Sequence, residues 1–448
     1  MGKTYREWSP DQGYLFPPSP RDWLGEDHLV YFLTDAVAEM DLRPIYDHYE
    51  REGRGQPPFH PRMMVSLLLF CYCTGTFSSR RIMSRCGTDV ACRVIVGNDI
   101  PNFRTISDFR KIHLTALEGL FVEVLKLCRA AGLAKVGRVA LDGTKVKANA
   151  SRHKAMSYER MQQEEKRLKE EIAKLLAEAE STDQREDAEH GDRHGDELPE
   201  ELARRESRLK KIRAAKKALQ TQAKAAAEAE AERRVAEGKP PKAPKPGSVK
   251  PDPKSQRNFT DPDSKIMKSS NKGWDQCGNA QAVANQEQII LAADVTDQAN
   301  DKQQLEPMYE ATHENLKRAR IREKVGKFSA DAGYYSEDNV AYLERKRVDP
   351  YIATGRLKHH EEIAPPRGRP PVGLSAKQRM ARKLRTKRGR REYGKRKGII
   401  EPIFGQIKQA RGFRQFLLRG LDKIRAEWRL ICLTHNLLKL YRHQLTTT

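Results

Sequence analysis

Three carboxylates in this sequence are placed to act together, although they are far apart in the chain. Asp142 follows a predicted strand, Asp331 follows a later strand, and Glu401 lies on a predicted helix. Phosphodiester cleavage by two metal ions needs hard oxygen ligands that converge from separate elements, with the ions about 3.5–4 Å apart. If the two strands are parallel neighbours, both aspartates emerge at one edge of the sheet, and Glu401 is expected to swing over that edge as a third ligand.

Each of these acids also has an ordinary structural interpretation. Asp142 and Asp331 are both followed within two residues by glycine, and aspartate in such turn sequences accepts backbone hydrogen bonds. Glu401 directly precedes Pro402, as a surface residue early in a helix would. Three further aspartates also follow a predicted strand and compete for the same role: Asp294, Asp297 and Asp301. Spacing alone therefore leaves the choice of carboxylates open.

The elements around these acids predict an α/β domain. Residues 136–150 contain a strand that breaks at or just after Asp142, and residues 280–293 contain two strands of a β-hairpin. Later helices and strands alternate in this order: helix 301–319, strand 327–330, helix 336–346, strand 350–353, helix 393–409 and helix 422–440. A hairpin followed by alternating helices and strands indicates a mixed sheet covered by helices, the layout of a ribonuclease H-like domain.

The first 135 residues predict an all-helical region. Apolar helices are expected over 63–73 and, after Ser78, over 79–85, and a third helix is expected from a Thr105–Asp108 capping pair to Leu133. Basic residues lie on these helices: Arg80, Arg81, Arg85, Arg104, Arg110 and Lys111. They fit either a helix-turn-helix-like DNA reader or a helical bundle with solvated arginines.

A charged insertion separates the first predicted strand from the hairpin. Residues 164–176 and 199–237 predict two helices that fold back on each other, and residues 239–253 form a basic, proline-rich linker. The predicted division of the chain is a helical N-terminal domain for DNA ends (1–135), the first catalytic strand (136–155), the insertion and linker (156–255), the rest of the catalytic domain (256–415) and a C-terminal helix (416–448).

Composition narrows the classes of function. Lys and Arg total 84 against 61 Asp and Glu, a formal charge of +23, which favours a polyanionic partner such as nucleic acid. No apolar run reaches the ~20 residues of a membrane span, and no signal segment opens the chain, so a secreted or membrane protein is not expected. The sequence also lacks the P-loop, nucleophile-elbow and dinucleotide fingerprints of small-substrate enzymes.

The seven cysteines are expected to be reduced and buried. Their number is odd, and several fall within apolar helical stretches. Zinc binding by Cys71, Cys73, Cys86 and Cys92 is disfavoured, because the pairing of ligands that structural zinc sites show at both ends is missing.

The residues that flank the acids resemble a known family, the DDE transposases of bacterial insertion sequences, especially the group typified by insertion sequence eleven-eighty-two. The similar segments are 139–150 around Asp142, 261–265, 278–281 and 293–296 in the hairpin region, 329–335 around Asp331, and 393–408 around Glu401. The last segment resembles a Tyr-Arg-Glu-Lys signature formed by Tyr393, Arg396, Glu401 and Lys408. Its Arg-to-Glu interval is one residue longer than in the commonest form, and Lys395 and Lys397 are the alternatives to Arg396.

The resemblance implies a DNA transposase. It predicts that Asp142, Asp331 and Glu401 bind two Mg²⁺ ions, with Mn²⁺ as an alternative, for strand cleavage and strand transfer. It also implies double-stranded DNA partners (terminal inverted repeats and target DNA), a homodimer or larger assembly on paired ends, and a cytoplasmic, nucleoid-associated protein without a membrane partner. The resemblance spans about residues 45–440.

A basic segment supports the DNA partner independently. Residues 376–397 hold twelve Lys or Arg and one acid, which favours contact with the phosphate backbone. The predicted DNA contacts beside the signature residues Tyr393, Arg396 and Lys408 are Lys387, Arg388, Arg390, Arg391, Lys395 and Lys397. Two other functions fit the same features: a metal-dependent nuclease that cleaves without joining, and a non-catalytic DNA-binding protein derived from a transposase.

Overall fold

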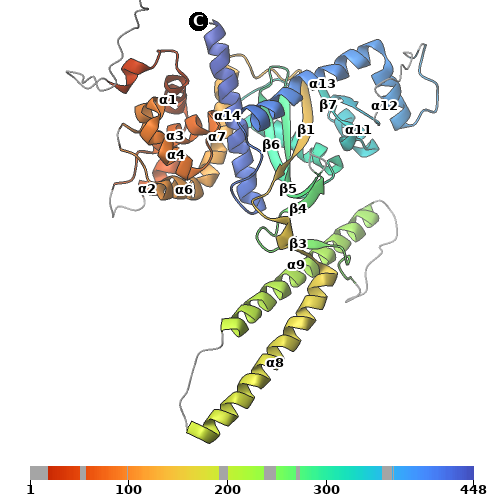
Figure 1. Ribbon diagram of the computed structural model, residues 1–448. Coiled ribbons are helices and arrows are strands. Elements are labelled where there is room, and N and C mark those ends of the chain that lie inside the picture. Colours follow the sequence, from red (N-terminus) through yellow and green to blue (C-terminus); the bar gives the residue numbers. More distant parts are fainter. Residues whose placement is uncertain are drawn as a thin grey trace, which may run out of the picture.

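The computed structural model describes residues 19–50, 57–97, 99–190, 200–236, 249–268, 273–355, 366 and 368–447. A mixed β-sheet carries helices on both faces, a group of N-terminal helices lies beside it, and a long helical arm extends away from it (Figure 1). The predicted α/β class with a mixed sheet is therefore confirmed.

The sheet is built from six strands. They are β1 (Arg138–Lys147), β4 (Lys265–Lys268), β5 (Trp274–Asn285), β6 (Ile290–Thr296), β7 (Lys327–Ala330) and β8 (Asp349–Ile352). The order is β4-β5-β1-β7-β8, and β6 pairs with β5 as well. Strands β1, β7 and β8 are parallel, whereas β5 runs antiparallel to β1, β4 and β6. The β5–β6 pair is the hairpin predicted from the sequence, with longer strands.

The first strand corrects one expectation. It does not break at Asp142, because β1 continues to Lys147 and stays paired with β5 as far as Lys147 opposite Cys277. Only its parallel pairing with β7 stops there, with Leu141 opposite Ala330 as the last pair. The long antiparallel partner supplies the backbone hydrogen bonds that keep the strand extended beyond the aspartate.

Helices cover both faces of the sheet. One face carries α10 (Leu305–Arg318) and α11 (Glu337–Arg345), and the other carries α13 (Lys387–Gly405) and α14 (Leu421–Thr447), while α12 (Ala376–Arg385) precedes α13. Tyr309 of α10 packs against Phe328 of β7. On the other face, Phe404 of α13 stacks on Trp428 of α14, whose indole N–H donates to the Gln281 carbonyl at 2.9 Å.

The N-terminal region is helical as predicted, with one difference. Its helices are α1 (Leu29–Glu39), α2 (Arg43–Glu50), α3 (Pro61–Cys73), α4 (Ser79–Thr88), α5 (Val90–Val96), α6 (Phe103–Ile112) and α7 (Leu114–Ala130), after a 3-10 turn over Pro20–Trp23. The single helix expected from Thr105 is wrong: α6 begins at Phe103 with Asn102 as its cap, and His113 separates α6 from α7. His113 is buried, and its ring is 2.9 Å from the Tyr49 hydroxyl, a tertiary contact that local pattern does not reveal.

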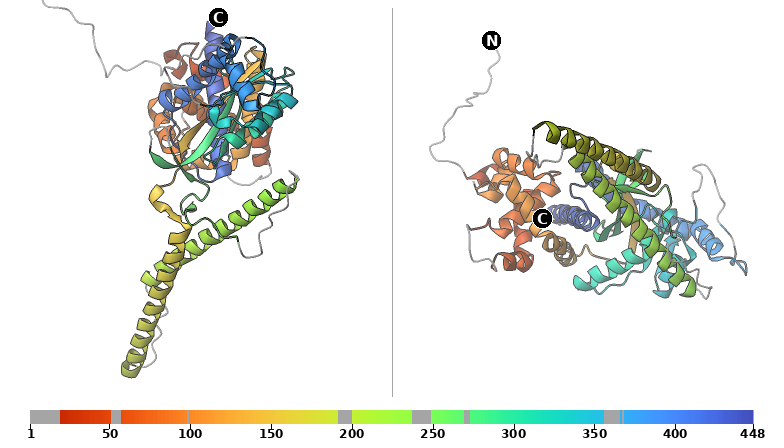
Figure 2. Two further views of the ribbon diagram at one scale, coloured as in Figure 1. Left: turned by 90° about the vertical axis from the view of Figure 1, so that its right-hand side faces the viewer. Right: turned by 90° about the horizontal axis from the view of Figure 1, so that it is seen from below.

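The insertion forms the predicted antiparallel hairpin, α8 (Tyr158–His190) and α9 (Glu200–Ala236), and projects from the rest of the molecule (Figure 2). Glu165 pairs with Lys216 at 2.9 Å and Glu171 with Arg205 at 3.1 Å, so the two helices run in opposite directions. A small two-stranded sheet, β2 (Ala155–Ser157) and β3 (Gln256–Asn258), closes the base of the arm. Much of the predicted linker 239–253 lies outside the described residues.

Two further expectations are tested by the fold. All seven cysteines are buried and free of disulfide bonds, as predicted for reduced thiols. Within the ranges that the structure describes, no helix combines the length and the apolar character needed to cross a membrane.

Candidate active site

Asp142 and Asp331 lie next to each other at one edge of the sheet. Strands β1 and β7 are parallel neighbours, and the pair Leu141–Ala330 immediately precedes the two aspartates. Successive strand residues advance by about 3.3 Å, so both acids lie at the same level, one residue beyond the last β1–β7 pair. The condition under which both aspartates emerge at one edge, adjacent and parallel strands, is therefore met.

Both aspartates also make the turn-type hydrogen bonds that their sequences suggested. Asp142 Oδ1 accepts the Gly143 N–H at 2.8 Å. Asp331 caps a 3-10 turn over Ala332–Tyr334, and its Oδ1 accepts the Gly333 N–H at 2.8 Å. Each of these contacts uses one carboxylate oxygen, so the structural and chemical interpretations of the two acids are compatible.

Arg396 connects Asp142 with the third predicted acid. Its guanidinium is 2.9 Å from Asp142 Oδ2 and 4.0 Å from Glu401 Oε1. The Arg396 side chain is 10% exposed, whereas Lys395 and Lys397 are exposed on the outer side of α13. Of the three candidates for the arginine of the signature, Arg396 alone contacts the acids in this structure. Glu401 itself is 56% exposed.

The other two signature residues contact Arg396 and the part of β1 that follows Asp142. The Tyr393 ring lies 5.8 Å from the Arg396 guanidinium, a cation–π arrangement. Lys408 lies in a π-helical turn over Gln406–Ala410, where its ammonium donates to the Thr144 hydroxyl and to the Lys145 carbonyl, the latter at 2.8 Å. Burial lowers the pKa of Lys408. Both residues therefore face the same end of β1 as Asp142.

Opposing effects act on the ionisation of Asp142. Burial raises its pKa most, the positive charge of Arg396 lowers it, and the negative charge of Asp331 raises it, with a raised pKa as the net result. Two neighbouring carboxylates repel each other unless a cation lies near them. In this structure Arg396 supplies that cation.

Asp301 lies close to the candidate site. The sequence indicated it only as one of three further aspartates that could act as metal ligands. Its Oδ1 accepts hydrogen bonds from Asn279 at 2.6 Å and from Gln281 at 2.9 Å, and lies 3.3 Å from the Lys145 ammonium. It also borders the turn after Asp331, because an added Cβ at Gly333 would be 3.1 Å from Asp331 Oδ1 and 3.5 Å from Asp301 Oδ2.

The other two competing aspartates lie elsewhere. Asp294 pairs with Arg425 of α14 at 3.1 Å, and Asp297 makes no side-chain contact with these acids among the described residues. Asp294 lies within β6, whereas Asp297 and Asp301 follow the strand, and their positions depend on how the loop after β6 folds back, which no local signal in the sequence reveals.

The buried hydroxyl of Tyr334 marks the other side of the site. It donates to the Gln281 side-chain oxygen directly beside Gly143. Burial, followed by the charges of Asp301, Asp142 and Asp331, raises the Tyr334 pKa well above its usual value. This tyrosine therefore remains a neutral donor, and the charges of the nearby aspartates oppose its ionisation.

A broad basic surface adjoins the acids on α12 and α13. Six of the predicted DNA contacts are exposed along α13: Lys387, Arg388, Arg390, Arg391, Lys395 and Lys397. The single acid of this segment, Glu392, is only 3% exposed. It pairs with Arg138 and Lys327 underneath, and the surface residue Arg391 lies 3.6 Å from it.

The donor atoms at the site are of the type that a hard divalent ion prefers, but among the described residues too few of them lie together to bind one. Carboxylate oxygens are the ligands that Mg²⁺ prefers, and Asp142 and Asp331 supply them from adjacent strands. In the part of the chain that the structure describes, however, no three acidic, histidine or cysteine side chains gather closely enough to hold a metal ion. Glu401 is separated from the aspartates by the Arg396 guanidinium.

Two transposase families match separate parts of the chain, and neither match includes Asp142. Residues 236–437 match the family described as Transposase DDE domain, and residues 18–112 match the family described as Transposase domain (DUF772). The first match includes Asp331 and Glu401, and the second covers the helices from α1 to α6. No curated protein and no solved structure matches the chain. Both matched families are transposase families, so the two matches support a likeness to DDE-family transposases.

Proposed function

We propose that this chain is a DNA transposase of a bacterial insertion sequence in the group typified by insertion sequence eleven-eighty-two. It binds the terminal inverted repeats, cleaves the strands there and joins the ends to target DNA. The main support is the parallel register of β1 and β7 that brings Asp142 beside Asp331 beneath the helix of Glu401. The sheet order and the two matching transposase domains agree with a ribonuclease H-like catalytic domain.

The proposed metal ligands are Asp142, Asp331 and Glu401, for two Mg²⁺ ions or for Mn²⁺ in their place. The raised pKa of Asp142 supports a cation at this edge, because a divalent charge would favour the ionised form that burial and Asp331 disfavour. When bound, such ions activate water or a terminal 3′-hydroxyl and stabilise the leaving oxygen.

The surrounding residues position DNA in this proposal. Arg396 pairs with Asp142 and offers a buried, planar donor for a phosphate group. Lys408 is held over β1 by Thr144 and the Lys145 carbonyl, so its ammonium is oriented before DNA binds. The exposed cations of α13 bind the backbone on either side, an interaction that weakens steeply with salt.

The N-terminal helices, within the proposed unit 1–135, bind the DNA ends. Four of the basic residues named there are exposed: Arg80, Arg81, Arg104 and Lys111. Arg110 is instead buried and donates to the Tyr72 hydroxyl at 2.9 Å, and Arg85 pairs with Asp89 at 2.7 Å. The DNA contacts of this region are therefore assigned to the exposed four. A homodimer or larger complex brings the two ends together on the nucleoid.

The test is a cleavage-and-joining assay with Mg²⁺. Labelled DNA carries the inverted repeats that flank this coding sequence, and wild type is compared with Asp142→Asn. The matched control is Asp297→Asn, a carboxylate after β6 that lies outside the acid cluster. Cleavage at the repeat boundary with a joined product, lost in Asp142→Asn and retained in the control, supports the proposal. Equal activity of Asp142→Asn and wild type would contradict the metal-ligand assignment.

One observation favours a second candidate, a DNA-binding descendant without catalysis. Arg396 pairs with Asp142 where a metal ion would neutralise it, and Glu401 is largely exposed. Specific binding of the repeats without cleavage by wild type, in both Mg²⁺ and Mn²⁺, would favour this candidate. Cleavage without any joined product would instead indicate a metal-dependent nuclease on the same fold.

A further inference from the structure

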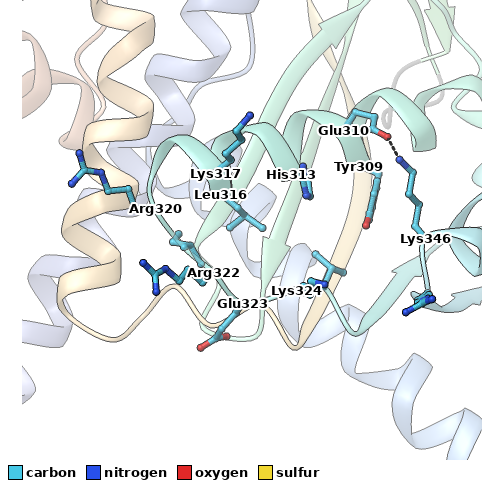
Figure 3. Close-up of a pocket in the computed structure, with 13 residues that line it drawn as sticks. Tyr309, Glu310, His313, Leu316, Lys317, Arg320, Arg322, Glu323, Lys324 and Lys346 are labelled. Carbon is cyan, nitrogen blue, oxygen red and sulfur yellow. Dashed lines mark ion pairs between the residues drawn. The ribbon is translucent and has the colours of Figure 1, made fainter.

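A pocket of about 680 Å³ lies between α10 and the loop that leads into β7 (Figure 3). Tyr309, His313 and Leu316 of α10 line one side of it, and the loop of Arg322 and Lys324 lines another. The pocket is at the start of β7, whereas Asp331 follows its end. The four residues of β7 span about 13 Å at about 3.3 Å per strand residue, so the pocket and the candidate active site lie at opposite ends of this strand.

We call this cavity the Arg320 pocket. Its lining is strongly basic. The lining contains six Lys or Arg side chains and two acidic side chains. The acids are already engaged: Glu310 pairs with Lys346 at 2.8 Å, and Glu323 accepts the Val136 N–H at 3.1 Å. Among the residues that the structure describes, the other five cations form no ion pair: Lys317, Arg320, Arg322, Lys324 and Arg347. A concave surface of one charge sign attracts and concentrates anions.

Helix capping does not account for these cations. Cations near a helix C-terminus often stabilise its exposed carbonyls, and both α10 and α11 end at this pocket. However, the carbonyls of Ala319 and Arg320 accept from Arg129, a residue outside the pocket lining, at 3.0 and 3.1 Å. The side chains of the five unpaired cations remain available to a ligand.

The backbone conformation of two of the arginines also supports a role in ligand binding. Arg320 and Arg347 have φ of 57° and 60°, the left-handed conformation in which glycine is normally preferred after a helix. Each helix closes with the same hydrogen-bond pattern, Ile321 N–H to the Leu316 carbonyl after α10 and Val348 N–H to the Leu343 carbonyl after α11. Folding alone would favour glycine at both places, so the arginine side chains have a role besides chain geometry.

We propose that the Arg320 pocket is a second DNA-contact site, which binds backbone phosphates of a DNA segment at a distance from the acids. Guanidinium and ammonium groups recognise phosphodiester oxygens without regard to sequence. The site positions DNA and takes no part in the chemistry. This inference depends on the proposed function only in taking DNA as the ligand.

The test removes charge without damaging the fold. Arg320→Gly and Arg347→Gly, singly and together, replace the two left-handed arginines by the residue that suits this backbone best, so thermal stability is expected to stay equal or to rise. Binding is measured in the full chain with Asp142→Asn, on labelled repeat DNA, over a series of salt concentrations. Each substitution should weaken binding several-fold at low salt and reduce the slope of log K against log salt by about one.

Two control variants separate charge from backbone effects. Gln288→Gly relieves the third left-handed non-glycine residue among those described, at φ 62°, without changing charge. Lys423→Ala removes one exposed cation of α14, away from the pocket. Neither should change the salt slope in the way the pocket variants do. Pocket variants that bind with wild-type affinity and salt slope would overturn the inference.

The remaining outcomes show whether the pocket binds the phosphates of DNA or of a free nucleotide. They also separate failure of this inference from failure of the proposed function. Saturable binding of ATP that the pocket variants lose, with their DNA binding unchanged, would assign the pocket to a free nucleotide and overturn the DNA assignment. A wild-type chain that binds no DNA at any salt concentration would overturn this inference and the proposed function together. Wild-type DNA binding with no effect of the pocket variants would overturn this inference alone.

Discussion

At the scale of single residues, Arg396 and Gly143 determine the shape and charge of the candidate active site. Arg396 reaches from α13 to Asp142 and offsets the repulsion between the two aspartates. Gly143, the next residue of β1, faces the opposite side of the sheet, where the Gln281 side chain and the Tyr334 hydroxyl occupy the space of an absent Cβ. Each residue supports a separate prediction.

Replacing Arg396 should shift the titration of Asp142. In Arg396→Gln the pKa of Asp142 is expected to rise further, since burial and the charge of Asp331 are then unopposed by the guanidinium. NMR titration of ¹³C-labelled aspartate carboxyls measures the change. As pH falls, any Mg²⁺-dependent cleavage by Arg396→Gln should therefore lose activity at a higher pH than cleavage by wild type does. Lys395→Gln, an exposed neighbour on α13, is the control, and an unchanged Asp142 titration in Arg396→Gln would contradict the assignment.

A methyl group at position 143 should destabilise the site. In Gly143→Ala the added Cβ would overlap the Gln281 side-chain nitrogen, and it would lie 3.0 Å from the Tyr334 hydroxyl. Overpacking of this kind costs about 1–3 kcal/mol of unfolding free energy. Urea denaturation measures the loss, and the double variant Gly143→Ala/Gln281→Ala should recover part of it. A single variant as stable as wild type would show that the neighbours move aside freely.

At the scale of elements, α13 must be held firmly for Arg396, Glu401 and Lys408 to face β1. It starts immediately after α12, with Thr386 as its cap and with Gly389 in a place where any Cβ would collide with the Lys383 carbonyl. Its anchor on the sheet is the buried Glu392, which pairs with Arg138 of β1 and, at 2.9 Å, with Lys327 of β7. The exposed side of α13 is thus cationic, whereas its buried side is attached to the sheet through the anionic Glu392.

Loss of that attachment should be costly. Glu392→Gln leaves Arg138 buried without its anion, and removal of one partner of a buried pair costs about 3 kcal/mol or more. Lys327 and Arg138 hold the pKa of Glu392 at about 2, so its stabilising contribution is present above the unfolded-state value of 4.5 and is lost as pH falls from there toward 2. Thermal melts between pH 3 and 7 measure both effects.

The control for this prediction is Glu344→Gln, an exposed glutamate of α11. It should melt like wild type over the same pH range. Equal stability of Glu392→Gln and wild type at pH 7 would mean that the buried pair does not anchor α13.

At the scale of the whole molecule, α14 joins the N-terminal helices to the sheet (Figure 1). Its Arg429 pairs with Glu118 of α7, and its Tyr441 donates to the Asp27 carbonyl at 2.9 Å. Its Asn436 binds both backbone groups of Ile290 in β6 at 2.8 Å. The apolar core is continuous across this helix, so the proposed DNA-binding helices and the acids belong to one packed unit.

A buried acid on α14 should make this unit sensitive to pH. Burial raises the pKa of Glu427 to about 7, although its carboxylate accepts the Leu417 and Leu418 N–H groups at 3.1 Å. The folded state therefore holds a proton that the unfolded state releases near 4.5, and stability should fall by about 3 kcal/mol as pH rises from 4.5 through 7. Thermal melts at pH 5 and 8 test this in wild type and Glu427→Gln. A slope that the variant does not reduce would assign the pH dependence to other groups.

Local features of the sequence determined much of the fold. The hairpin of β5 and β6, the strand β7 and the helix α11 with its Ser336 cap follow from short-range alternation, turns and capping, which act within a few residues. The buried, reduced cysteines and the antiparallel arm were equally predictable, because composition and helical periodicity express them directly. The candidate acids Asp142, Asp331 and Glu401 are likewise marked by the short motifs that surround them in the chain.

Other features depend on partners distant in the chain, and only the tertiary structure decided them. Strand β1 passes Asp142 because β5 pairs with it there, and α6 and α7 separate at a histidine that packs against Tyr49. Arg396 rather than Lys395 or Lys397 faces the acids because the packing of α13 on the sheet selects one side of the helix. The approach of Asp301 and the pairing of Arg396 with Asp142 likewise arise where separate elements meet, and no local pattern encodes such distances.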